Sequence, residues 1–160
     1  MDAAEPLETN YAGAIYGTIL SMAVIAALSH DPTLSATGVA GWTVATALVF
    51  FIAHVYSHIV GAGFARPAKA LALVRSESRK EWPMVQGALA PAAMMMLAPL
   101  GLVSEENASF VAVWTGVLLL IGAGIVIGRR ERLGFGRSLI IGAINGAIGL
   151  LIVGLKVLVH

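Results

Sequence analysis

The chain has 160 residues, of which 58% are hydrophobic and only 12% are charged, and its mean hydropathy is +0.87. Soluble domains carry about 25% charged residues, and a single soluble core of this size cannot hide so much apolar surface, so the composition is that of an integral membrane protein. The net charge of +1 gives no reason to expect nucleic acid as a partner, and the absence of cysteine excludes disulfides, thiolate metal sites and thiol nucleophiles.

The segment before residue 11 is acidic, since it contains Asp2, Glu5 and Glu8 and no basic residue. A secretory signal needs a positively charged region before its apolar core. We therefore expect the first apolar stretch to be retained as a membrane span.

Five apolar stretches are long enough to cross a bilayer, whose hydrocarbon core of ~30 Å requires roughly 20 helical residues. Backbone polar groups cannot stay unpaired in lipid, so each stretch is predicted to be a helix. The sequence thus predicts an all-α, polytopic transmembrane bundle of five spans that forms one domain over residues 1–160. The spans are 11–29, 37–63, 83–103, 107–128 and 136–159.

Local signals mark the starts of two spans. Trp82 suits the membrane interface, and Pro83 is expected in the first turn of the third span, where its missing N–H costs no hydrogen bond. Ser104 is expected to cap the fourth span, and Glu105 and Glu106 suit the positive end of that helix.

The basic residues are concentrated at two of the four connections, whereas the connections "SHDPT" and "SEENA" contain none. In a chain of five spans, the second and fourth connections share one side, and the positive-inside rule places that side in the cytoplasm. The N-terminus is therefore predicted to be cytoplasmic and the C-terminus to be outside. The first cluster is Arg66, Lys69, Arg75, Arg79 and Lys80, and the second is Arg129, Arg130, Arg132 and Arg137.

The segment 64–82 is too charged to insert into a bilayer. Leu71 and Val74 can share one helical face, while Lys69, Arg75 and Arg79 lie elsewhere. This pattern predicts a short basic helix on the cytoplasmic membrane surface, with the first basic cluster near anionic lipid headgroups. A solvated connection is the alternative.

Small residues recur at four-residue spacing in three of the spans. Such stripes let helix backbones approach closely in lipid, so we expect them to mark helix contacts, either within one subunit or between subunits. A bundle of five helices is small to enclose a polar path alone, and we therefore expect a homo-oligomer. The stripes are Gly13, Gly17 and Ser21, then Gly124 and Gly128, then Gly142 and Gly146.

The third span contains three consecutive methionines, residues 94–96, between Pro91 and Pro99. Clustered thioethers can bind copper(I), but three consecutive helical residues point about 100° apart and cannot converge on one ion. Packing is therefore the favoured role of these methionines. Pro91 is expected to kink the span.

Few polar side chains lie within the spans, and such side chains are the first place to look for function because they cost free energy in lipid. We expect them to form an ion or proton pathway, since most of them fall in the cytoplasmic half of their spans. Lys156, near the outer end, either extends to the headgroups or pairs with an acidic residue there. The residues are Tyr16, His54, Tyr56, His58, Gln86, Asn145 and Lys156.

His54 and His58 are four residues apart and therefore share one helical face. Proton relay or sensing is one use of such a pair, and a structural hydrogen bond to a neighbouring helix is another. A metal site is the weaker alternative, because a stable site needs three or four ligands and Val55 stands where a zinc protease has glutamate. Haem would need imidazoles from opposite sides, so we expect no cofactor.

Four segments carry a resemblance: "YGTILSMAVIAALS", "FFIAHVYSHIVG", "EWPMVQGALAPA" and "GLLIVGLKVLVH". In these, the chain resembles a group of uncharacterised small multi-span integral membrane proteins of actinobacteria. The resemblance runs over most of the chain and implies a multi-pass protein of the bacterial plasma membrane. It implies no activity, cofactor or catalytic residue.

Together these features predict a small integral membrane protein that forms an oligomeric proton or ion channel or transporter around membrane-embedded histidines. A non-transporting scaffold or accessory subunit of a larger complex is the alternative, favoured by the lack of a carboxylate within the predicted spans. We expect no enzyme, because the sequence offers no nucleophile–base pair and no full set of metal ligands.

Overall fold

The computed structural model describes residues 11–61 and 67–158, without the side chains of 67–70 and 156. The helices and strands of this part of the chain are all α-helices, and four of these are long and apolar enough to cross a membrane: α1, α2, α4 and the Phe135–Leu155 part of α5. The predicted all-α, membrane-type fold is thereby confirmed, while the count of five spans stays a prediction. The helices are α1 (Tyr11–Leu28), α2 (Ala36–Gly61), α3 (Pro67–Met95), α4 (Glu105–Arg130) and α5 (Phe135–Leu158).

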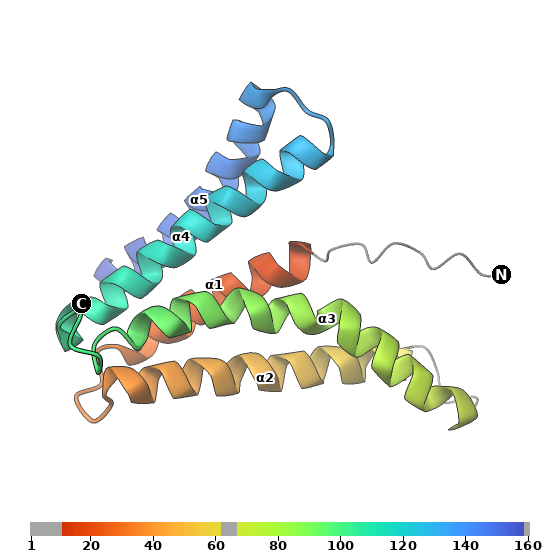
Figure 1. Ribbon diagram of the computed structural model, residues 1–160, viewed down its shortest axis with the longest axis horizontal. Helices are drawn as coiled ribbons and strands as arrows, with labels where there is room; N and C mark the ends of the chain where they lie inside the picture. Colours follow the sequence, from red (N-terminus) through yellow and green to blue (C-terminus); the bar gives the residue numbers. More distant parts are fainter. Residues whose placement is uncertain (1–10, 62–66, 159–160) are drawn as a thin grey trace.

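The third helix begins much earlier than the predicted span. α3 runs without interruption from Pro67 through the charged residues to Met95, so Pro83 lies in its interior rather than in its first turn. Pro83 and Pro91 each remove one backbone hydrogen bond, and the helix bends instead of ending (Figure 1). The charged first half keeps α3 out of the group of four apolar helices.

The regular part of α3 also ends before residue 103, where the predicted span ends. After Met95 the chain tightens into turns in which the N–H of Leu97 donates to the carbonyl of Met94 over 3.2 Å. Gly101 then adopts φ 72°, and the N–H of Leu102 donates back to the carbonyl of Leu97 over 3.0 Å. This is the closure of a Schellman motif, and glycine takes its left-handed position without strain.

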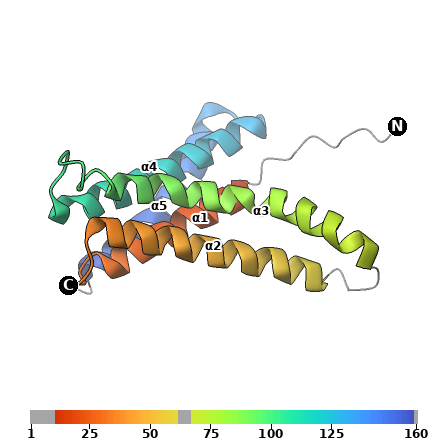
Figure 2. The same cartoon turned by 60° about the horizontal axis from the view of Figure 1, so that its bottom comes forward.

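Two groups of helices make up the molecule (Figure 1). In the first group α3 packs along both α1 and α2, and it follows α2 over its length in both views (Figure 2). In the second group α4 and α5 form an antiparallel hairpin. The groups meet where α4 begins, and their helix axes diverge toward the turn between α4 and α5 (Figure 1).

The core lies where α1, α2, α3 and α4 meet. Met22, Ile25 and Leu120 are almost fully buried there, together with many alanines. Of the three consecutive methionines, Met95 is buried in this core and Met96 is 39% exposed. They thus point in different directions, as the packing interpretation of the run requires.

The small-residue stripes lie in helix contacts. A methyl group on Gly17 would overlap the backbone of Met84 in α3, and one on Gly87 would overlap the backbone of Ala14 in α1. Gly124 and Gly128 of α4 meet α5 in the same way, next to Gly142 and Ser138. These contacts join helices of one subunit, since each pair belongs to one chain. The stripe residues buried in the structure are Gly13, Gly17, Ser21, Gly124, Gly128, Gly142 and Gly146.

One predicted cap is not formed. Ser104 stands at the N-cap position of α4 with extended backbone angles, but its side chain makes no capping hydrogen bond. The N–H groups of Asn107 and Ala108 instead donate to the carbonyl oxygen of Ser104, both over 3.0 Å.

Candidate functional site

The face of α2 that carries the histidines meets different partners at its two positions. His54 is half-buried, its Nδ1 lies 2.9 Å from the carbonyl oxygen of Phe50, and its ring centroid lies 5.5 Å from that of Tyr16 in α1. Tyr16 also contacts the ring of Phe50, with centroids 6.3 Å apart. His54 is thus part of an aromatic cluster between α1 and α2, with its nearest hydrogen-bonding atom in its own helix.

His58, one turn further along α2, faces two carboxylates of α3. Its Nδ1 lies 3.9 Å from Oε2 of Glu77, and its Nε2 lies 3.6 Å from Oε1 of Glu81. Both glutamates are largely buried, with relative exposures of 8% and 9%, whereas the His58 side chain is 53% exposed. The imidazole of His58 therefore lies between the two buried carboxylates and the surface of the bundle.

A lysine side chain of α3 completes this cluster. Nζ of Lys80 lies 2.8 Å from Oε1 of Glu77, so one ammonium accompanies two carboxylates. Buried carboxylates are costly in a low-dielectric environment unless polar or charged partners lie close to them. We refer to His58, Glu77, Lys80 and Glu81 as the His58 cluster.

Sequence reasoning did not identify the acidic half of this cluster. Glu77 and Glu81 lie in the segment 64–82, which the sequence analysis assigned to the membrane surface or to a solvated connection. One signal was present: the glutamates have the same four-residue spacing as His54 and His58, so each pair lies on one face of its helix. Only the continuation of α3 alongside α2 brings the two faces together.

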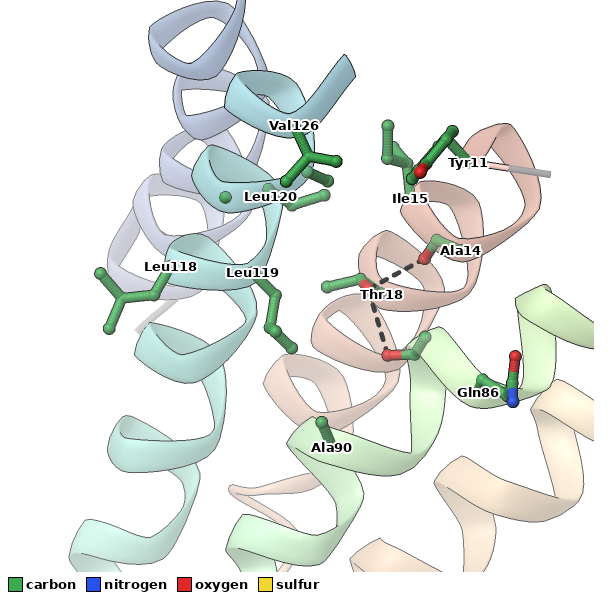
Figure 3. A pocket seen from close by; sticks show the side chains of 13 residues that line it. Tyr11, Ala14, Ile15, Thr18, Gln86, Ala90, Leu118, Leu119, Leu120 and Val126 are labelled. Atoms are coloured by element: carbon green, nitrogen blue, oxygen red, sulfur yellow. Dashed lines mark hydrogen bonds between the residues drawn. The ribbon is translucent and has the colours of Figure 1, made fainter. Parts of the chain in front are cut away.

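The other predicted pathway residues are dispersed. Tyr56 is 63% exposed on α2. Gln86 of α3 is exposed and lines a groove formed with α1 and α4 (Figure 3). Asn145 is half-buried between α5 and α4, next to Gly124, and the Lys156 side chain lies outside the described residues. The seven residues therefore do not line a single path within one subunit.

The alternative role of His54 and His58 is to bind a metal ion, which would need at least one more ligand. Among the residues that the structure describes, no group of three or more His, Asp or Glu side chains could hold a metal ion. His54 and His58 also face different surroundings, the first an aromatic cluster and the second the two glutamates.

The first basic cluster is only partly available to lipid. Arg75 and Arg79 are exposed on α3, whereas Lys80 is paired with Glu77. Arg66 and the Lys69 side chain lie outside the described residues.

The chain matches no protein-family model, no curated protein and no solved structure. Its function is therefore argued from the geometry of these side chains.

Proposed function

We propose that the chain is a multi-pass protein of the bacterial plasma membrane that conducts or transports protons, with the His58 cluster as its cytoplasmic proton-binding group. The observation that carries the proposal is the position of His58 within 3.9 Å of Glu77 and 3.6 Å of Glu81. Histidine exchanges protons near neutral pH, and buried carboxylates beside it supply the acceptor sites of a relay.

In this proposal α3 is the third of five spans. Its apolar part from Pro83 to Met95 covers roughly 20 Å at 1.5 Å per residue, and the turns up to residue 103 supply the remaining depth. The N-terminus is then cytoplasmic, because both basic clusters lie on one side. This orientation puts the end of α2 and the start of α3, and with them the His58 cluster, at the cytoplasmic boundary of the bilayer.

The proposed path continues between copies of the chain. The described core of one subunit is apolar, so a single subunit supplies no polar route beyond the cluster. A homo-oligomer in which the exposed face of α2 meets its neighbour would bring Tyr56 of several copies to a shared axis. The resemblance of the four sequence segments to actinobacterial membrane proteins is the ground for the bacterial plasma membrane.

The experiment measures proton flux into vesicles that contain the purified protein, as a function of pH. His58→Gln and Glu81→Gln are expected to reduce the flux and to remove its pH dependence, because each removes a proton acceptor with little change in shape. The matched controls are Glu131→Gln in the turn after α4 and Glu106→Gln at the start of α4, since both glutamates are exposed and both variants should conduct like the unmodified protein. Equal flux in all five proteins would reject the proposal.

The second candidate is a non-transporting scaffold or accessory subunit. It is favoured by the separation of Gln86 and Asn145 from the His58 cluster, since polar residues in three separate contacts suit helix packing better than conduction. It predicts no flux from the protein alone and a second membrane protein that co-purifies with it in stoichiometric amount.

A further inference from the structure

A groove of about 410 Å³ lies between α1, α3 and α4 (Figure 3). Its volume falls within the range of about 300–1,000 Å³ that is typical of ligand sites. Ile15, Leu119 and Val126 are among the side chains that line it (Figure 3). Because these side chains are apolar, the groove suits a saturated hydrocarbon chain.

The Thr18 hydroxyl group in the lining already has hydrogen-bond partners. Oγ1 of Thr18 donates to the carbonyl oxygens of Ala14, at 2.9 Å, and Gly87, at 3.1 Å (Figure 3). It therefore offers no free donor to an occupant. The polar groups at the edges, Tyr11 and Gln86, leave the middle of the groove apolar.

The mouth of the groove is basic. Leu119, Ala123 and Val126 line it from α4, and Arg130 continues the same helical face at the end of that helix. The guanidinium carbon of Arg130 lies 5.0 Å from the ring centroid of Tyr11, the first residue of α1. A cation at the end of α4 thus contacts the first residue of α1, on the other helix group.

More positive charge lies near Arg130 in the sequence. Arg129 contacts the ring of Phe135 at 6.0 Å, and Arg132 and Arg137 are exposed close by in sequence, with Glu131 as the one acidic residue among them. The apolar groove and the basic mouth together match one ligand chemistry, an acyl chain that carries an anionic headgroup.

We propose that the groove binds one acyl chain of an anionic phospholipid, whose phosphate is held by Arg130 at the mouth. The guanidinium presents paired N–H donors suited to phosphate oxygens, and its contact with Tyr11 places it beside the groove. A zwitterionic lipid offers the same chain but no net charge for the basic mouth. The site depends only on the membrane character of the chain and not on proton transport.

The experiment uses the full-length purified protein in detergent and counts retained lipids by native mass spectrometry. Phosphatidylglycerol and phosphatidylcholine with identical acyl chains are the two probes. We expect preferential retention of phosphatidylglycerol, and Arg130→Gln should weaken it roughly fivefold, which corresponds to about 1 kcal/mol for one basic residue near a lipid headgroup. Ala123→Trp should reduce the retention of both lipids, because the indole occupies the groove.

Three controls keep the result interpretable. Arg130→Lys retains the charge and should retain the preference, Arg75→Gln removes an exposed charge elsewhere, and Leu150→Trp adds an indole to an exposed position of α5. Equal retention of the two lipids by the unmodified protein would overturn the proposal. So would unchanged retention in Arg130→Gln and Ala123→Trp, or an Ala123→Trp variant that changes only the oligomeric state, since a second copy would then occupy the groove.

Discussion

The carboxylate of Glu105, the first residue of α4, accepts a hydrogen bond of 2.8 Å from the backbone N–H of Ala36, the first residue of α2. The first N–H groups of a helix have no partner within it, and a negative charge near them is favourable because of the helix dipole. Glu105 thus caps a helix that is far away in sequence and ties the starts of α2 and α4 together.

We expect Glu105→Gln to lower the free energy of unfolding by about 1 kcal/mol, the usual effect of losing a charged helix cap. The matched control is Glu106→Gln, because Glu106 lies in the same first turn and is exposed. Unfolding of both variants in mixed micelles, followed by circular dichroism, measures the difference. Equal losses in the two variants would show that the charge acts on α4 alone.

The contact between α1 and α3 depends on the absence of side chains at two glycines. Gly87→Val should destabilise the protein by about 1–3 kcal/mol, because the added methyl groups meet the backbone of Ala14 and the helices must separate. Gly41→Val is the control, since nothing lies within 4 Å of a Cβ at that position of α2. The thermal midpoints of the two variants in detergent give the comparison, and similar midpoints would argue against close packing at Gly87.

Met22 ties the two helix groups together. It is fully buried, and its sulfur lies where a methyl group on Gly116 of α4 would stand. Met22→Ala is expected to cost ~2 kcal/mol, the lower part of the range for large-to-small core changes, because lipid is as apolar as the core and only the packing contacts are lost. Leu118→Ala, which shortens a side chain that is 66% exposed, should be nearly neutral. An equal effect of both changes on the unfolding midpoint would contradict the assigned core.

The helices themselves could be predicted from the sequence, because apolar length is a direct consequence of the bilayer's thickness. The bounds of α1, α4 and α5 lie within a few residues of the predicted spans. α3 is the exception, since the sequence predicts that its span starts at Pro83. A proline fits that position in isolation, but packing against α1 and α2 carries the helix through it.

Of the His58 cluster, the sequence identifies His58 as a candidate site residue but not Glu77 and Glu81. The spacing of His54 and His58 identifies one face of α2, but the partners of that face depend on how two helices align, which no local pattern encodes. Glu77 and Glu81 lie among basic residues in sequence, and the charged segment as a whole is typical of a membrane surface or a solvated connection. Their burial follows from the tertiary contact between α2 and α3.

The last prediction concerns the turn between α1 and α2, where Thr33 lowers the pKa of Asp31 below its ordinary value of 3.8. The Thr33 hydroxyl donates to Oδ1 of Asp31 over 2.6 Å, and the Thr33 N–H donates to the same oxygen over 2.8 Å. Both bonds favour the ionised carboxylate. Because the folded pKa lies below the unfolded one, the stabilisation is complete above the unfolded pKa and disappears as the pH falls through the folded pKa.

Asp31→Asn should therefore lower the unfolding midpoint slightly at pH 7, and the gap to the unmodified protein should close in acid, at pH values below 3.8. Thr33→Val removes the hydroxyl donor, so Asp31→Asn made in that background should have a smaller effect at pH 7. The measurement is the unfolding midpoint of the four proteins between pH 2 and pH 7. A gap that stays constant over this range would show that the charge of Asp31 does not stabilise the turn.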